Sequence, residues 1–175
     1  MIYRKTALAD LDAVLAVYRR AKAFMDQTGN PDQWEEGYPS GTMVEEDVRS
    51  GIGRVLADED GKILAVLAFF TEEDPAYREI RDGAWPSDAP YAVVHRIATG
   101  EPGRGLAAIA LGEAVKEAVS LGFTELRMDT YKDNLPMQRF LAREGFIRCG
   151  TVSLNGDFTD EKRLRLAYAK DLTKA

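Results

Sequence analysis

The apolar positions along the chain follow two periods, and each period predicts one kind of element. Apolar residues three and four places apart indicate amphipathic helices, whereas short apolar or alternating runs indicate strands. The predicted strands span residues 2–5, 54–57, 63–70, 91–99, 125–130, 146–154 and 164–169. The predicted helices span residues 9–27, a short segment after Thr42, the segment from Leu106 to a stop at Gly122, and residues 134–144. This order, β-α-α-β-β-β-α-β-α-β-β, predicts an α/β chain with a mixed sheet and helices on both faces.

Turn-forming residues set the connections between these elements. Thr42 and Glu45 have the spacing of a capping box at the start of the second helix. Asp60-Gly61 predicts a hairpin between the second and third strands, and Asn155-Gly156 predicts another between the last two. Residues 71–90 are acidic and contain proline, so we expect a long loop with at most one helical turn, of the kind that covers a site.

The segment 91–123 carries the most specific pattern in the chain. An apolar strand, YAVVHRIAT, is followed by a turn with three glycines and a proline around Arg104, and then by a helix. This order aims free backbone N–H groups and the positive helix end at one point, which suits a phosphate or pyrophosphate. The turn has neither the third glycine of G-x-G-x-x-G nor the Gly-Lys-Ser/Thr of a P-loop, so those two nucleotide motifs do not explain it.

Composition restricts the classes of function. The chain has 175 residues, which predicts a single domain over residues 1–175, and its net charge of −6 argues against a nucleic-acid partner. No apolar run approaches a membrane span and no signal peptide opens the chain, so we expect a cytoplasmic protein without membrane contact. The single cysteine excludes an internal disulfide, and one cysteine with one histidine argues against a zinc site, so no metal is expected.

Two spaced motifs resemble those of one enzyme family. Residues 103–107 resemble motif A of the GNAT superfamily of N-acetyltransferases, with Pro102 where glutamine or arginine is usual. Residues 133–146, DNLPMQRFLAREGF, resemble motif B, with Met137 in place of alanine and Leu141 in place of tyrosine. The motif B positions that match are Asn134, Gly145 and Phe146. The resemblance covers nearly the whole chain and implies the GNAT fold, with a mixed, mostly antiparallel seven-stranded sheet.

The resemblance also implies a reaction. Acetyl-CoA, as cosubstrate, would lie between the strand ending at Thr99 and the strand ending at Thr130, and its acetyl group would pass by direct attack to a primary amine. The amine would belong to a small molecule or to an exposed protein amine. The implied cofactor-binding residues are Ile97, Ala98, Thr99, Gly103, Arg104, Gly105, Leu106, Ala107, Asn134 and Met137. A backbone N–H near Ile97 or Ala98 would hold the thioester oxygen.

One alternative function and the oligomeric state stay open. Because Leu141 replaces the usual tyrosine and Pro102 the usual basic residue, the chain is also compatible with a catalytically idle acyl-CoA-binding module. A homodimer is compatible with the sequence but is not indicated by it.

The candidate catalytic residues each have a structural alternative. His95 lies two residues before Ile97 and is the candidate general base; otherwise it is a hydrogen-bonded core histidine. Tyr131 is the candidate acid that protonates the leaving thiolate; otherwise it packs or is solvated, and Tyr168 or solvent donates instead. Cys149 could take the acetyl group covalently, but strand packing explains it better.

The acceptor side is weakly specified. Trp34 and Tyr38, with Glu35, Glu36 and the acidic run 72–74, could form an acidic, aromatic entrance for a cationic amine. The alternative is a solvated acidic face and two aromatic anchors that pin a loop.

Overall fold

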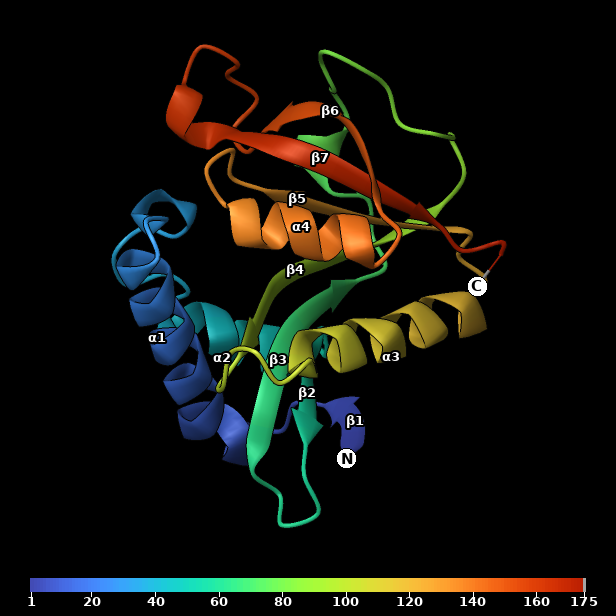
Figure 1. Cartoon of the computed structure of the whole chain (residues 1–175). Helices are drawn as coiled ribbons and strands as arrows, with labels where there is room; N and C mark the ends of the chain where they lie inside the picture. Colours follow the sequence, from blue (N-terminus) through green and yellow to red (C-terminus); the bar gives the residue numbers. More distant parts are fainter. Residues whose placement is uncertain (175) are drawn as a thin grey trace. The chain divides into compact units, whose positions relative to one another are not determined.

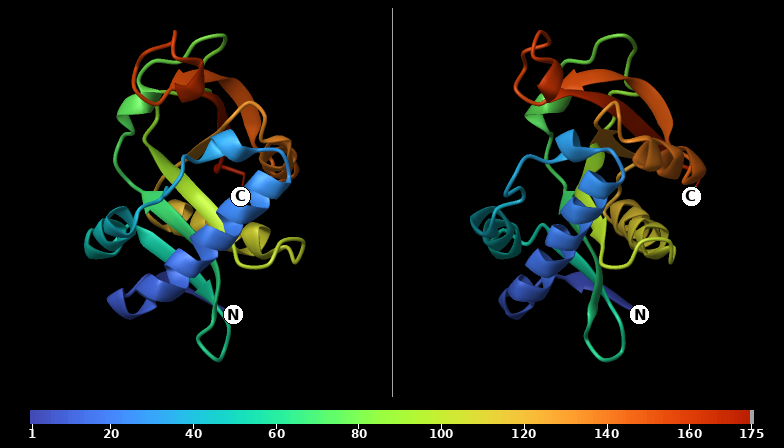
Figure 2. Two further views of the ribbon diagram at one scale, coloured as in Figure 1. Left: turned by 90° about the vertical axis from the view of Figure 1, so that its left-hand side faces the viewer. Right: turned by 60° about the vertical axis from the view of Figure 1, so that its left-hand side comes forward.

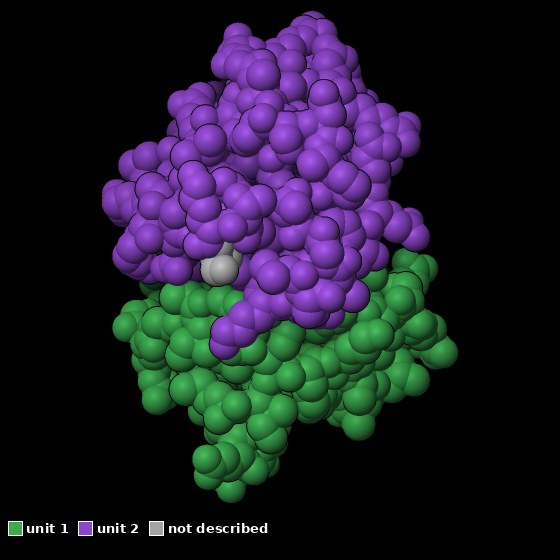
Figure 3. Space-filling view, turned by 90° about the vertical axis from the view of Figure 1, so that its right-hand side faces the viewer, with its two compact units in different colours: residues 1–69, 94–114 green, residues 70–93, 115–175 purple. Residues whose placement is uncertain are grey.

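The computed structural model describes residues 1–174 and divides into two compact units (Figure 3). Unit 1 contains Met1–Phe69 and Val94–Ala114, and unit 2 contains Phe70–Val93 and the chain from Val115 onward. Each unit has its own cluster of buried apolar side chains. The single domain over residues 1–175 stays a prediction.

The elements follow the predicted order along the chain (Figure 1). The strands are β1 (Ile2–Lys5), β2 (Gly53–Ala57), β3 (Ile63–Phe70), β4 (Tyr91–Thr99), β5 (Glu125–Thr130), β6 (Ile147–Ser153) and β7 (Leu164–Asp171). The helices are α1 (Leu11–Gln27), α2 (Gly41–Arg49), α3 (Leu106–Ser120) and α4 (Leu135–Arg143). Short 3-10 turns cover Leu8–Asp10, Pro31–Gln33, Pro75–Tyr77 and Glu161–Arg163.

The strands form one seven-stranded sheet in the order β1-β2-β3-β4-β5-β7-β6. Antiparallel ladders join β1 to β2, β2 to β3, β5 to β7 and β7 to β6. β4 and β5 run parallel, with Tyr91 opposite Glu125, and α3 is the crossover that a parallel pair requires. The predicted mixed, mostly antiparallel seven-stranded sheet is therefore confirmed.

The core of unit 1 lies between its helices and its strands. Val14 and Tyr18 of the predicted apolar stripe of α1 are buried at 3% and 4% exposure, and Val17, outside that stripe, is buried at 0%. These side chains join a cluster with Val44 of α2 and Ala98 of β4. α1 and the first part of α3 cover opposite faces of the strands of this unit (Figure 2).

The start of α2 differs from the prediction. The helix is capped by Ser40, whose Oγ accepts the backbone N–H of Met43 at 3.1 Å, and not by Thr42 with Glu45. Both Ser40 and Thr42 are residue types that cap helices well, and Ser40 comes first in the chain. Val44, in the first turns of the helix, is 3% exposed and lies in the core. Glu45 pairs instead with Arg49 one turn later, at 2.5 Å.

Unit 2 is built on the β5-β7-β6 ladder. Asn134 caps α4 by accepting the N–H of Met137 at 3.2 Å, and Pro136 lies in the first turn, where the N–H that proline lacks would have no acceptor within the helix.

The closing hairpin is confirmed, but its connection runs from residue 154 to 163 and contains a 3-10 turn, so it is not the tight turn that Asn155-Gly156 predicts.

The long loop of residues 71–90 is fixed to the strands of unit 2. It contains one short helical turn, as predicted, and Trp85 donates from Nε1 to the carbonyl of Tyr77 at 2.9 Å. The guanidinium of Arg127 lies 4.1 Å from the ring centre of Trp85 and 3.7 Å from that of Tyr91. Arg127 also pairs with Glu125, and both side chains are 5% exposed. The loop is therefore anchored by the hydrogen bond of Trp85 and by its contact with Arg127, a member of a buried charge pair.

Among the described residues, no helix is long and apolar enough to cross a membrane.

Candidate functional site

A glycine-rich loop joins the end of β4 to the start of α3, within unit 1. The N–H of Gly100 donates to the carbonyl of Leu64 at 3.0 Å, which ties the start of the loop to β3. Gly103 and Gly105 adopt φ values of +82° and +70°. Other residues enter this left-handed region at a cost of about 1–2 kcal/mol, which explains glycine at both places. The N–H of Ile109 donates to the carbonyl of Gly105 at 3.2 Å, so α3 begins directly after this turn.

The predicted pyrophosphate-contacting residues therefore occupy a helix start. Residues 103–105 are exposed, Leu106 is 4% exposed and anchors the helix, and Ala107 is half-buried. The first N–H groups of a helix have no acceptor within it, so those of α3 are available at this exposed turn. Ile97, Ala98 and Thr99 lie in the same strand–loop–helix segment of unit 1, on the last residues of β4. The structure thus keeps these eight predicted residues in one unit.

Basic side chains gather around this loop, although the chain as a whole is acidic. Glu101 accepts from Lys62 at 2.8 Å and from Arg104 at 2.5 Å. These hydrogen bonds, with the attraction of the two charges, lower the pKa of Glu101 from 4.5 to about 2. Arg20 packs over Gly100, where an added Cβ would lie 3.2 Å from its guanidinium. Two cations thus pair with one carboxylate and a third lies against Gly100, so basic groups outnumber acidic ones here, which favours an anion at the loop.

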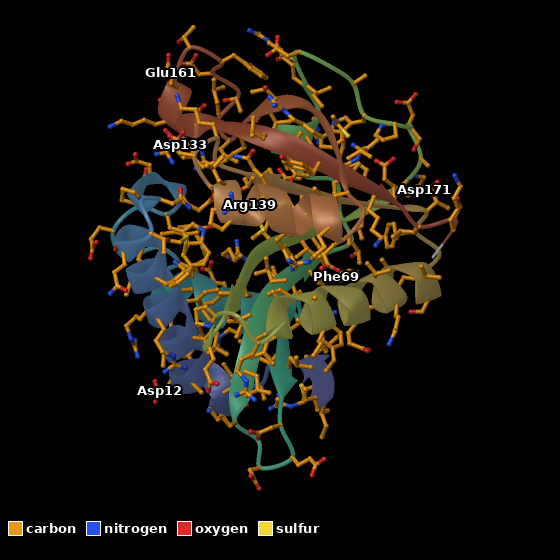
Figure 4. All side chains as sticks on the ribbon, viewed as in Figure 1. Asp12, Phe69, Asp133, Arg139, Glu161 and Asp171 are labelled. Atoms are coloured by element: carbon orange, nitrogen blue, oxygen red, sulfur yellow. The ribbon has the colours of Figure 1, made fainter. Side chains whose placement is uncertain are left out.

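Acidic side chains elsewhere project away from their elements. Figure 4 shows this for Asp12 on α1 and for Asp171 at the end of β7, both exposed to solvent. The net negative charge is therefore carried by scattered surface residues and does not argue against an anion at the loop.

β4 bends at Arg96, between the candidate base and the candidate thioester-binding amides. Arg96 has φ of +54° in the interior of a strand, a left-handed conformation that costs a non-glycine residue about 1–3 kcal/mol. Burial along the strand changes there: Ala92–Val94 are buried, His95 is half-buried, and Ile97 and Ala98 are 9% and 6% exposed. The bend thus fixes the direction of the peptide that carries the Ile97 N–H and places His95 immediately before it.

A buried ion pair meets this bend. Arg96 donates from Nη2 to Oδ2 of Asp47 in α2 at 2.7 Å, and both side chains are 10% exposed. Burial works against the charge of Arg96, but Tyr38, Asp47 and Tyr18 together hold its pKa above the ordinary value. Burial raises the pKa of Asp47, and the guanidinium of Arg96 opposes that shift. Sequence reasoning missed this pair, whose only signals were an arginine inside an apolar strand and an aspartate on the inner face of a short helix.

The aromatic residues of the expected acceptor entrance are packed inside unit 1. Trp34 is 8% exposed and lies with its ring centre 5.7 Å from that of Tyr18 and 5.9 Å from that of Tyr38. Glu35 and Glu36 beside it are exposed. This arrangement favours the interpretation that Trp34 and Tyr38 pin the loop, and that Glu35 and Glu36 belong to a solvated surface.

The remaining predicted site residues lie in unit 2. Tyr131 follows β5, is 6% exposed, and has the guanidinium of Arg165 5.1 Å from its ring centre. The side-chain oxygen of Asn134 is engaged as the cap of α4, and Met137 is half-buried and supplies the N–H that it accepts. Capping explains Asn134 structurally, and contacts of Asn134 and Met137 with the cofactor stay predictions.

The alternatives to Tyr131 are buried side chains. Leu141, at the position of the family's tyrosine, is fully buried at 0% exposure and serves as core. Tyr168 is 5% exposed, and burial raises the pKa of its hydroxyl. Cys149 is 8% exposed and burial raises the pKa of its thiol, which disfavours the thiolate that covalent catalysis needs. The packing interpretation of Cys149 is supported.

Comparison with known proteins identifies the family. A model of the acetyltransferase (GNAT) family matches residues 12–146, a range that includes the bend, the glycine loop and α4. The chain belongs to this family. Among curated proteins no relative matches the sequence.

Solved structures of GNAT proteins share the fold. A GNAT-family acetyltransferase from Streptococcus agalactiae is 29% identical, with a TM-score of 0.83 over 97% of this chain and 94% of that one. A GNAT-family acetyltransferase from Listeria monocytogenes is 16% identical, with a TM-score of 0.72 over 97% and 94%. The GNAT-like decarboxylase GphF, in complex with isobutyryl-CoA, is 16% identical, with a TM-score of 0.69 over 98% and 100%. At 16% identity the likeness concerns the fold alone.

Proposed function

We infer that this GNAT protein transfers an acyl group, with acetyl as the expected one, from acyl-CoA to a primary amine. The observation that carries the inference is the exposed turn of Gly103–Gly105 at the start of α3, which contains Arg104 and follows loop residues contacted by Arg20 and Lys62. Backbone N–H groups, a helix start and nearby cations together suit the pyrophosphate of coenzyme A. The acceptor is a small molecule or an exposed protein amine.

The last residues of β4 would serve the reacting thioester. The N–H of Ile97 or Ala98 would hold its oxygen and stabilise the negative charge that develops during attack. An alkylamine has a pKa near ~10 and is mostly protonated at neutral pH, so it must lose a proton before it attacks. His95, half-buried beside the bend, is the proposed general base.

Direct attack by the amine fits the chain better than a covalent intermediate. Cys149 is the single cysteine, and the raised pKa of its thiol keeps it protonated at neutral pH. Tyr131 is the proposed proton donor to the departing thiolate, with solvent as the alternative donor, since a thiolate leaves readily. Tyr131 and Tyr168 are equally buried, and Tyr131 is preferred because it directly follows β5, where the thioester is expected.

The acyl group and the acceptor are tested together by release of free coenzyme A thiol. Acetyl-CoA and isobutyryl-CoA would each be incubated with polyamines, amino acids, aminoglycosides and a short peptide with a free amine. We expect amine-dependent thiol release with acetyl-CoA and at least one acceptor. If acetyl-CoA binds but no amine accelerates thiol release, the chain is the idle acyl-CoA-binding module. Cytoplasmic location and a homodimer stay predictions.

A further inference from the structure

Arg96 combines a left-handed backbone conformation with a buried charged side chain. Its φ is +54° within β4, a conformation that is strained for any residue other than glycine, and its side chain is only 10% exposed. A left-handed non-glycine residue persists only when the surrounding structure holds it in place. The contacts of its side chain identify what holds it.

Three segments of unit 1 meet at this guanidinium. Asp47 of α2 accepts from Nη2 at 2.7 Å, with both side chains 10% exposed. Tyr38, in the connection between α1 and α2, and Tyr18, on α1, both act on its charge and raise the pKa of Arg96. The side chain therefore links α1, the following connection and α2 to the bend of β4.

Stability alone is a poor explanation for such a pair. A buried ion pair often stabilises a fold no better than apolar side chains of similar volume, because both charges lose their hydration. It does impose one geometry, since the guanidinium and the carboxylate must meet at a fixed distance and orientation. The residue whose geometry is imposed here lies between His95 and Ile97.

We propose that Arg96 is a positioning residue for acyl transfer, and that its contact with Asp47 holds the bend of β4. The bend sets the direction of the Ile97 N–H and the place of His95, and Arg96 itself does not contact the substrate. The proposal rests on the proposed function. Because a misplacement of about 1 Å in a catalytic group can cost about 10²-fold in rate, loosening the bend is expected to affect kcat strongly.

Three variants and one control separate the effect of the Arg96 side-chain contact from the effect of the backbone conformation at residue 96. Arg96→Ala removes the anchor and disfavours positive φ, whereas Arg96→Gly removes the anchor but tolerates positive φ. Asp47→Asn keeps the shape of the partner and removes its charge. Arg127→Lys changes a second buried pair, with Glu125 in unit 2, where both side chains are 5% exposed, and is the control.

The first readout is steady-state kinetics with calorimetric binding of acetyl-CoA. We expect Arg96→Ala and Asp47→Asn to lower kcat by about 10²-fold, with unchanged affinity for acetyl-CoA and a smaller change in KM. Arg96→Gly should lose less than Arg96→Ala, and Arg127→Lys should keep the wild-type kcat. Wild-type kcat in both Arg96→Ala and Asp47→Asn would overturn the proposal, as would an Arg127→Lys variant as slow as they are.

The second readout is the backbone conformation of residue 96 by nuclear magnetic resonance, which needs no substrate. Carbon shifts and the coupling between amide and α protons should show positive φ in wild type, an average over positive and negative φ in Arg96→Gly, and extended backbone in Arg96→Ala and Asp47→Asn. Positive φ retained in Asp47→Asn would overturn the role of the ion pair even in an inactive protein. If wild type transfers no acyl group to any amine, the proposed function fails, and this measurement still decides whether Asp47 holds the bend.

Discussion

The glycine loop yields the sharpest prediction, because unit 1 contains a second glycine that serves as its control. Gly105 has φ of +70° in the loop, and Gly61 has φ of +83° in the turn between β2 and β3. A Cβ added at either glycine would meet no described heavy atom within 4 Å, so neither Gly105→Ala nor Gly61→Ala creates a clash. The two changes therefore differ only in where they are made.

The cost to the fold can be worked from the backbone. Alanine in the left-handed region is less favourable by about 1–2 kcal/mol, and the lower entropy of the unfolded chain returns about 0.4–1 kcal/mol. We expect each variant to lose about 1 kcal/mol of unfolding free energy, or about 2–4 °C in Tm for a chain of this length. Denaturant titration measures this loss, and it should be equal at Gly61 and Gly105.

Affinity for acetyl-CoA should fall in Gly105→Ala and not in Gly61→Ala. If the N–H groups of residues 103–107 hold the pyrophosphate, a methyl group at Gly105 occupies the face that the anion approaches. We expect calorimetry to show acetyl-CoA affinity reduced at least about tenfold in Gly105→Ala, which is about 1.4 kcal/mol, and unchanged in Gly61→Ala. Gly105→Val should abolish binding. Equal affinity in Gly105→Ala and Gly61→Ala would refute the assignment of the loop to the cofactor.

Three further predictions concern the proposed chemistry and the charges at the loop. His95→Ala should lower kcat/KM by about 10²- to 10⁴-fold with acetyl-CoA affinity unchanged; a wild-type kcat/KM in this variant would make His95 structural. Tyr131→Phe should slow turnover more than Tyr168→Phe, and equal rates for wild type and Tyr131→Phe would leave protonation to solvent. Glu101 should titrate at about 2 by nuclear magnetic resonance, below its ordinary 4.5, so its contribution to stability is present above pH 4.5 and is lost as pH falls to about 2. Lys62→Ala or high salt should raise this pKa, and an unshifted value would show that the pairing does not persist in solution.

The elements themselves could be predicted because their signals are local. The stripe that includes Val14 and Tyr18, and the apolar run of residues 91–99, depend on neighbours within a few positions. The glycine loop could be predicted for the same reason, since Gly103 and Gly105 are the residues that positive φ requires. Errors arose where two local signals competed, as with Ser40 and Thr42 at the start of α2.

The bend of β4 could not be predicted, because its cause lies far away in sequence. Arg96 and Asp47 are 49 positions apart, and an arginine gives no sign that its backbone is left-handed. The burial of Trp34 likewise depends on Tyr18 in α1, so the sequence could not separate an acceptor entrance from a packed anchor. Long-range packing, not local propensity, decides both positions.

The fate of a labelled acyl group tests the central proposal most directly. Wild-type protein would be mixed with isotopically labelled acetyl-CoA and the amine that gives the fastest thiol release, and all products would be analysed by mass spectrometry. Direct transfer predicts that the label appears on the amine nitrogen in step with thiol release, with none on Cys149. Label that stays on coenzyme A with every amine, appears only as free acetate, or accumulates on Cys149 would contradict the account.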